Sequence, residues 1–274
     1  MAAPGQVVGA TAGAARPGGA HSGALLFARY AYPPNAMGYC GPDAAAELLE
    51  RAAGGAGGAD DGLRRLARGF EGAWPYLELI AAANRIRDPL DRRVVEAYWI
   101  GNTLLDRVPP AMTAASLEHR FRDRTGERSW ERLVAAVPGA QPHHSFHVFG
   151  VYPWLGLLRG GRVDEPLLVL DRCRIRWGQV VAVAGDGAVV RSRPLKWDGR
   201  VLSEGPPRDE QVVIARDGYG LAGPLVAGDW CALHWDWVCE RLDRRRLAAL
   251  QARSRRQLAV VNALPYPAPA VVLA

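Results

Sequence analysis

Residues 179–192 read QVVAVAGDGAVVRS, two valine-rich runs joined by Gly-Asp-Gly. Valine favours extended strands, whereas glycine and aspartate tolerate the backbone of a tight turn between antiparallel strands. The stretch therefore predicts a β-hairpin. Similar short runs continue to residue 239, and their density, about five strands in seventy residues, is typical of a small OB-like β-barrel.

The chain before this hairpin carries helical signals. Apolar residues recur at helical spacing between residues 43 and 137, and Pro75 must kink or divide one of the helices. The valines and aromatic residues at 143–151 instead predict a strand. After the barrel, one apolar stripe predicts a closing helix over residues 243–263.

We therefore expect an α+β protein with two parts. A mainly α-helical N-terminal domain at 25–160 precedes a β-barrel with its closing helix at 165–265. Residues 1–22 are rich in glycine and alanine and predict a flexible tail, and residues 266–274 predict a proline-rich tail.

Composition restricts the function classes. The N-terminus lacks the continuous apolar segment of a secretory signal, and no apolar run is long enough to span a bilayer. The four cysteines form no CxxC pair, so we expect reduced thiols and a cytoplasmic protein. The net charge is +6, but the arginines near the C-terminus are interspersed with acidic residues. We expect a solvated helix face there, with neither nucleic acid nor a membrane as partner.

Two residues of the barrel region are candidates for metal binding. Cys173 lies just before the predicted hairpin, and His234 lies in a predicted strand at 230–239. Alternation along that strand places His234 beside Asp236 on the more polar face, where the carboxylate would orient the imidazole ring. An isolated strand histidine is more typical of a structural residue, so this pattern alone favours the structural interpretation.

From Cys173 to about Leu250, the sequence resembles the HypC/HupF-type hydrogenase assembly chaperones, a family of small barrel proteins. Their opening motif places a cysteine five residues before a glycine, here Cys173 and Gly178. Their closing motif corresponds to GDWCALHWDWVCERLDRRRLAAL at 228–250, with His234 in register. The chain departs from the family in having an internal cysteine, Trp177 where a proline is usual and Asp236 where a glycine is usual.

The resemblance implies a function in the assembly of nickel–iron hydrogenase. Such chaperones carry an iron ion bearing cyanide and carbon monoxide, and they escort the large-subunit precursor. The family's functional cysteine and histidine correspond to Cys173 and His234, and a thiolate with an imidazole suits low-spin iron. Arg172, Arg174 and Arg176 beside the cysteine would favour its thiolate form and attract an anionic iron group. We expect a transient iron fragment and no other cofactor.

Two N-terminal segments carry a second resemblance. Residues 30–43 and 71–86 resemble an uncharacterised actinobacterial family that is found with hydrogenase genes. This resemblance implies no mechanism, but it agrees with a non-enzymatic accessory factor for hydrogenase assembly. In such a factor, the barrel would bind the large-subunit precursor or the iron fragment, and the helical domain would bind another partner.

Two alternatives stay open. Cys40 precedes a predicted helix, whose dipole would lower the pKa of the thiol, and histidines follow at His143 and His147. A cysteine followed by a strand histidine is the order of papain-like enzymes, so a cysteine hydrolase or transferase is one alternative. In a strand, His143 and His147 share a face and would also be able to hold a metal with Cys40. The other alternative is a structural adaptor without chemistry.

Overall fold

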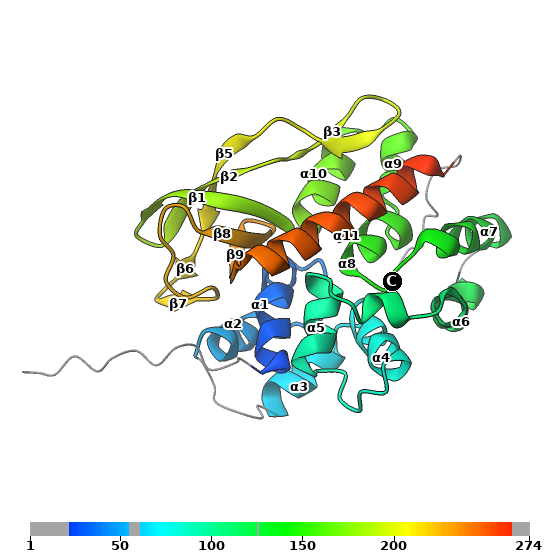
Figure 1. The fold of residues 1–274 in the computed structure, drawn as a ribbon, viewed down its shortest axis with the longest axis horizontal. Helices are drawn as coiled ribbons and strands as arrows, with labels where there is room; N and C mark the ends of the chain where they lie inside the picture. Colours follow the sequence, from blue (N-terminus) through cyan, green and yellow to red (C-terminus); the bar gives the residue numbers. More distant parts are fainter. Residues whose placement is uncertain (1–21, 55–60, 125, 265–274) are drawn as a thin grey trace, which may run out of the picture.

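The computed structural model describes residues 22–54, 61–124 and 126–264. It has the predicted α+β class: helices form the N-terminal part, a β-barrel follows, and a long helix comes last (Figure 1). The predicted tails at 1–22 and 266–274 lie outside the described residues, apart from Ser22. Its side-chain oxygen accepts a hydrogen bond from the Leu25 N–H at 3.2 Å, so Ser22 is the N-cap of the first helix.

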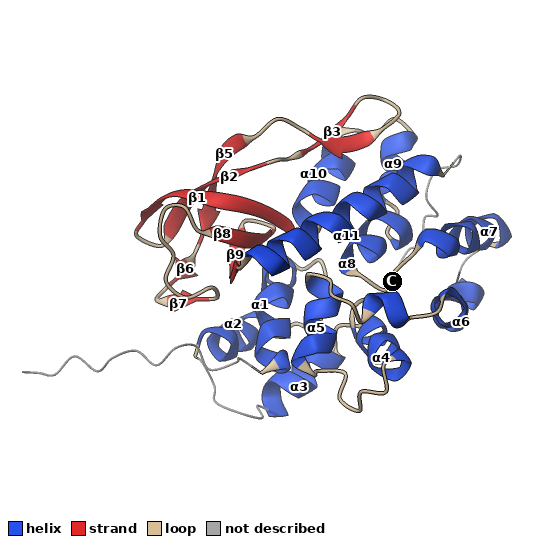
Figure 2. Cartoon of the chain, in the orientation of Figure 1, coloured by secondary structure: helices blue, strands red, loops and turns tan. Residues whose placement is uncertain are grey.

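Figure 2 shows the separation of the helices from the strands along the chain. The helices and helical turns are α1 (Gly23–Ala36), α2 (Ala45–Ala53), α3 (Asp61–Arg68), α4 (Trp74–Ala83), α5 (Arg92–Trp99), η1 (Leu105–Arg107), α6 (Pro110–Phe121), η2 (Arg122–Arg124), α7 (Glu127–Ala136), η3 (Val137–Gly139), α8 (His144–Phe146), η4 (His147–Val151), α9 (Trp154–Arg159), α10 (Asp164–Cys173) and α11 (Arg244–Ala263). Pro75 lies in the first turn of α4, so it divides the predicted helix rather than kinking it.

The sequence predicts a small barrel of about five strands, and this is confirmed. Five strands of the described residues close into a barrel, in the order β1-β2-β5-β9-β8. Among the strand pairs of the described residues, β5 and β9 alone are parallel. Two small sheets, β3-β4 and β6-β7, flank the barrel. The strands are β1 (Arg176–Ala184), β2 (Gly187–Ser192), β3 (Leu195–Trp197), β4 (Leu202–Glu204), β5 (Arg208–Val213), β6 (Ala215–Arg216), β7 (Tyr219–Gly220), β8 (Trp230–His234) and β9 (Trp237–Leu242).

The hairpin at 179–192 is confirmed, because β1 pairs with β2 in antiparallel register up to Ala184 and Gly187. The predicted strand at 230–239 is wrong in one respect. It is a second hairpin, in which β8 ends at His234 and β9 begins at Trp237. Trp235 has a φ of 51°, a left-handed conformation that reverses the chain and ends the alternation of side chains.

The segment at 143–151 is helical and not the predicted strand. It forms α8 and the π-helical turn η4, and every residue in it is buried. Valine and aromatic residues favour strands on half-exposed sheets, but this segment is buried and packs against other helices, including α11. Tertiary packing therefore decides its conformation.

One cluster of buried apolar side chains joins the two predicted parts. It extends from Ala24 of α1 to Leu250 of α11 and includes Trp99 of α5 and Cys239 of β9. The barrel also encloses a smaller cluster of its own. Helix α1 lies below β8 and β9 (Figure 1), so the helical part and the barrel meet at a shared core.

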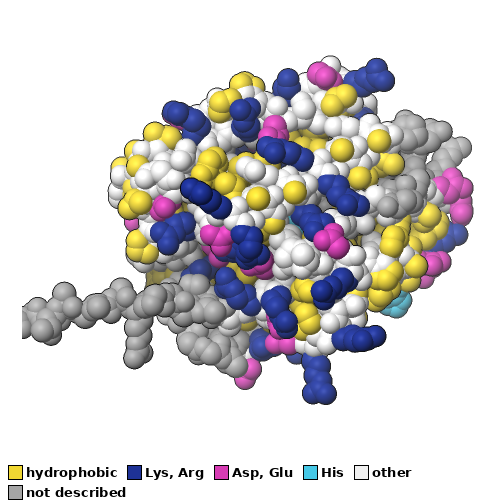
Figure 3. All heavy atoms as spheres, in the orientation of Figure 1, with side chains coloured by type: hydrophobic (Ala, Val, Ile, Leu, Met, Phe, Trp, Pro, Cys, Tyr) yellow, Lys and Arg dark blue, Asp and Glu magenta, His cyan; other side chains and the backbone are white. Residues whose placement is uncertain are grey.

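Helix α11 confirms the predicted closing helix and lies across both parts (Figure 1). Its arginines contact acidic residues elsewhere: Arg245 with Glu96, Arg253 with Asp106, and Arg255 with Glu204. Figure 3 shows the basic side chains on this face spread among acidic and apolar ones. Within the described residues, no helix combines the length and apolarity that crossing a membrane requires.

Candidate metal centre

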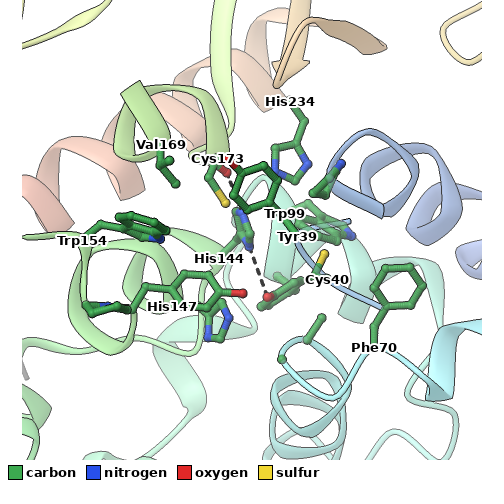
Figure 4. Close-up of a pocket in the computed structure, with 16 residues that line it drawn as sticks. Tyr39, Cys40, Phe70, Trp99, His144, His147, Trp154, Val169, Cys173 and His234 are labelled. Carbon is green, nitrogen blue, oxygen red and sulfur yellow. Dashed lines mark hydrogen bonds between the residues drawn. The ribbon is translucent and has the colours of Figure 1, made fainter. Parts of the chain in front are cut away.

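The site lies in a cavity of about 200 Å³ between the helical part and the barrel. None of the described residues that line it carries a formal charge. Its lining includes five soft or nitrogenous donors, which are Cys40, His144, His147, Cys173 and His234. Its walls are largely aromatic and include Tyr39, Phe70, Tyr98, Trp99, Tyr152 and Trp154 (Figure 4).

Cys173 is the last residue of α10, three positions before the first residue of the barrel. The chain turns from helical to extended backbone at Arg174, so the thiol lies at the junction between helix and barrel. Only 7% of Cys173 is exposed. The sulfur points into the cavity rather than toward the surface of the barrel (Figure 4).

His234 ends β8 and is fully buried. Its Nδ1 lies 2.6 Å from the carbonyl oxygen of Tyr30 in α1. A carbonyl only accepts hydrogen bonds, so Nδ1 carries the proton and Nε2 carries the lone pair. Nε2 makes no hydrogen bond of ordinary geometry among the described residues, although the backbone of Cys173 lies close enough to affect the pKa of the ring. A ligand at this nitrogen would therefore have no well-formed hydrogen bond to break.

The structure brings Cys173 and His234 together and adds His144. One ligand atom from each of the three side chains lies within 4.8 Å of the other two. The Nε2 of His144 donates to the Cys173 carbonyl at 2.8 Å, and its Nδ1 accepts from the Tyr98 hydroxyl at 3.2 Å. Because both ring nitrogens of His144 are already engaged, Cys173 and His234 are the more accessible ligands.

Burial keeps these three side chains neutral in the absence of a metal. It lowers the pKa of His144 to about 4, and together with the nearby His144 it lowers the pKa of His234 well below its ordinary value. Burial also raises the pKa of the Cys173 thiol. Neutral imidazoles have the lone pair that a metal requires, whereas the thiol must lose its proton on binding.

The predicted orienting role of Asp236 is wrong. Asp236 follows the turn at Trp235 and is exposed, and its carboxylate accepts a hydrogen bond from Arg172 at 2.7 Å. The turn directs His234 inward and Asp236 outward. The Tyr30 carbonyl orients the imidazole instead.

The predicted effect of the arginines on Cys173 is also wrong. Arg172 contacts Glu210 and Asp236, Arg174 contacts Asp171 at 3.0 Å, and Arg176 contacts Glu210. Their charges are compensated by these carboxylates outside the cavity. Burial dominates at the thiol, so its pKa is raised rather than lowered.

The structure brings two of the three residues of the alternative site, Cys40, His143 and His147, to the cavity. Cys40 and His147 line the same cavity, whereas His143 does not, because its ring accepts the Ser145 N–H as the cap of α8. In a helix, residues three apart share a face, so His144 and His147 point to the cavity together. The prediction that His143 and His147 pair on a strand is therefore wrong.

Cys40 lacks the features of an activated nucleophile. It lies five residues before α2, outside the first turn, and burial raises the pKa of its thiol to about 12. None of the hydrogen bonds among the described residues joins this thiol to a histidine. The predicted lowering of its pKa by a helix dipole is wrong, and the geometry does not favour the hydrolase.

Sequence reasoning missed His144 as a member of the site. The spacing of His144 and His147 would have indicated a shared face if the segment had been interpreted as a helix. The sequence also did not identify the aromatic residues that line the cavity, because Tyr98 and Trp99 look like ordinary core residues in the sequence.

Comparison with known proteins places the chain in a family without assigned activity. Residues 19–267 match the model of a family of unknown function, DUF6390, so the chain belongs to that family. No curated protein matches the sequence, and no solved structure matches the fold.

Proposed function

We propose that this member of DUF6390 is a non-enzymatic accessory factor that holds a soft metal fragment through Cys173 and His234 during the assembly of a nickel–iron hydrogenase. One observation carries the proposal: the two donors singled out by the resemblance to hydrogenase assembly chaperones are 61 positions apart (234 − 173), yet they line one cavity. The unpartnered Nε2 of His234 supports it further.

The donor set suits the proposed cargo. A thiolate and a neutral imidazole are ligands for low-spin iron, and Cys173 and His234 would hold the fragment as a transient substrate. The cavity of about 200 Å³ exceeds the space of a single water, which leaves room for small ligands on the metal. Its apolar walls suit uncharged or compensated groups, because a net charge is costly to bury there.

The partner in this proposal is the large-subunit precursor of the hydrogenase. It would contact the barrel beside the cavity, and the helical part would contact another assembly protein. The cavity lies between the barrel and the helices, so a partner that receives the fragment must approach at their junction (Figure 4).

The test is infrared spectroscopy on the full chain, purified without oxygen from cells that make the hydrogenase. We expect cyanide and carbonyl stretching bands that disappear in Cys173→Ala. Cys231→Ala is the matched control, because Cys231 is equally buried but belongs to the separate core of the barrel. Absence of the bands from the wild type, or their persistence in Cys173→Ala, would contradict the proposal.

A further inference from the structure

We propose that Cys40 is a second thiolate ligand of this site, carried into the cavity by a short strap, residues 38–41, that closes over the bound metal. The inference rests on the proposed function, because it takes Cys173 and His234 as the other ligands. The resulting set of two sulfurs and one nitrogen leaves the remaining positions of the metal to the small ligands of the proposed cargo.

The strap is bracketed by two glycines in the left-handed region. Gly38 has a φ of 75° and Gly41 a φ of 85°, conformations that other residues rarely adopt. A Cβ atom at Gly41 would lie 2.4 Å from the Phe70 ring, so only glycine fits. The two residues between these hinges, Tyr39 and Cys40, both line the cavity.

The strap is held to the end of α1 by backbone and side-chain hydrogen bonds. The N–H groups of Gly38 and Tyr39 donate to the carbonyl oxygens of Asn35 and Pro34, each at 3.0 Å. The side-chain amide of Asn35 donates to the carbonyl oxygens of Cys40 at 2.8 Å and Pro42 at 2.7 Å. The Tyr39 ring stacks on Trp235 with centroids 4.4 Å apart, next to His234. Tyr39 is 45% exposed and also lines the cavity, so it forms part of the outer wall. Rotation at the two glycines would move the ring and the thiol together.

Two buried nitrogens on residues of the cavity lining support a ligand there. His234 Nε2 and His147 Nδ1 have no hydrogen-bond partner among the described residues, although both side chains are buried and line the cavity. Buried polar atoms are normally satisfied, so these two indicate a missing partner. This observation is independent of the position of Cys40.

For a bare divalent cation, charge balance favours two thiolates over one. The described lining contains no carboxylate, so the thiols of Cys40 and Cys173 are its available anionic ligands. A bare cation such as cobalt(II) is neutral with both thiolates, whereas one thiolate would leave a net charge among largely apolar walls.

Cys40 lies outside the group formed by His144, Cys173 and His234, whose ligand atoms are all within 4.8 Å of one another. Its side chain lines the same cavity. Binding through Cys40 therefore requires the strap to carry its sulfur toward the other ligands, which is the movement that the proposal assigns to it.

The test uses cobalt(II) alone as the probe, added to the reduced full chain without oxygen. Each thiolate bound to cobalt adds ligand-to-metal charge-transfer absorption in the near ultraviolet. We expect Cys40→Ser to lose about half of this absorption and to weaken cobalt binding on the order of tenfold or more. Cys173→Ser should do the same. Cys231→Ser should match the wild type, because Cys231 lies outside the cavity.

A second variant tests the strap itself. Tyr39→Ala keeps every proposed ligand but removes the stacking on Trp235. We expect unchanged charge-transfer absorption and faster release of cobalt to a chelator. Equal release rates would overturn the closing role of the strap.

The outcomes separate the two proposals. Full absorption in Cys40→Ser with loss in Cys173→Ser would overturn the inference about Cys40 and leave the proposed metal site standing. Full absorption in both variants, or no cobalt binding by the wild type, would overturn both.

Discussion

The carbonyl oxygen of Tyr30 accepts a hydrogen bond from Nδ1 of His234 at 2.6 Å, across 204 positions of the chain. Through this bond, α1 of the helical part fixes the ring orientation of a barrel residue. The hydroxyl of Tyr30 contacts Glu240 of β9 at 3.1 Å, so the same residue contacts both strands of the β8–β9 hairpin. The geometry of the candidate site therefore depends on the docking of the two parts.

Replacement of His234 by alanine should destabilise the protein as well as remove a ligand. The substitution leaves a cavity and an unsatisfied Tyr30 carbonyl, and such changes cost about 2–4 kcal/mol. Urea denaturation measures the loss. The matched control is His119→Ala in α6, where the side chain is exposed and the cost should stay below about 0.5 kcal/mol. Equal unfolding midpoints for the two variants would contradict the structural role of His234.

The sequence predicted those elements whose pattern is local. The hairpin at 179–192 has its turn residues and its valines within fourteen positions (192 − 179 + 1). Helix α11 has polar residues on one face and apolar residues on the other, so its apolar stripe can be recognised in the sequence. Helix α1 escaped prediction because its residues are buried on every side, so no polar face alternates with an apolar one. Pro33 and Pro34 also argue against a helix, although both lie in its last turn.

The candidate site was only half predictable for a related reason. Cys173 and His234 were singled out because the sequence around them resembles two motifs of a known family. Cys40, His144 and His147 come to the same cavity through the docking of helices, which no local pattern encodes. The residues of the two alternative sites, apart from His143, line one cavity. The sequence does not show this relation, because it depends on how the helices pack.

Gly178 should be indispensable to the barrel. It lies in β1 at the position that follows Cys173 by five residues, and a Cβ atom there would lie 2.3 Å from the Val190 side chain in β2. Because that contact is with a packed core residue, Gly178→Ala must separate the strands and should cost about 1–3 kcal/mol. Gly126→Ala is the control, because nothing lies within 4 Å of its added atom. Thermal unfolding that ranks the control as the more damaging change would refute the argument.

Two adjacent acidic residues in β5 should differ sharply in importance. Glu210 pairs with Arg172 and Arg176 at 7% side-chain exposure, whereas Asp209 pairs with Arg191 at 43%. Removal of one partner from a buried pair costs about 3–5 kcal/mol, because a charge is left uncompensated. An exposed pair contributes about 0–1 kcal/mol.

Glu210→Ala should therefore lower the free energy of unfolding far more than Asp209→Ala, as denaturant titration would show. The Glu210 variant should also weaken metal binding, because its partner Arg176 donates to the Trp235 carbonyl beside His234. If both variants unfold at the same denaturant concentration, the buried network has no special role.

Stability should fall in mild acid because of the buried histidines. Burial lowers the pKa of His143 to about 3 and of His144 to about 4, below the value of about 6.5 in the unfolded chain. Between these values the unfolded chain binds more protons than the folded one, so stability is full above about pH 6.5 and declines as the pH falls. Each such histidine contributes a slope of up to about 1.4 kcal/mol per pH unit in this window.

His143→Asn isolates one of these contributions without removing a proposed metal ligand. The asparagine side chain can still cap α8 by accepting the Ser145 N–H, as His143 does, but it does not titrate. Urea midpoints measured with a chelator between pH 4 and 7.5 should show a shallower decline in the variant than in the wild type, with similar midpoints above pH 7. Parallel curves would mean that His143 is protonated in the folded protein, which its burial and the nearby charge of Arg253 argue against.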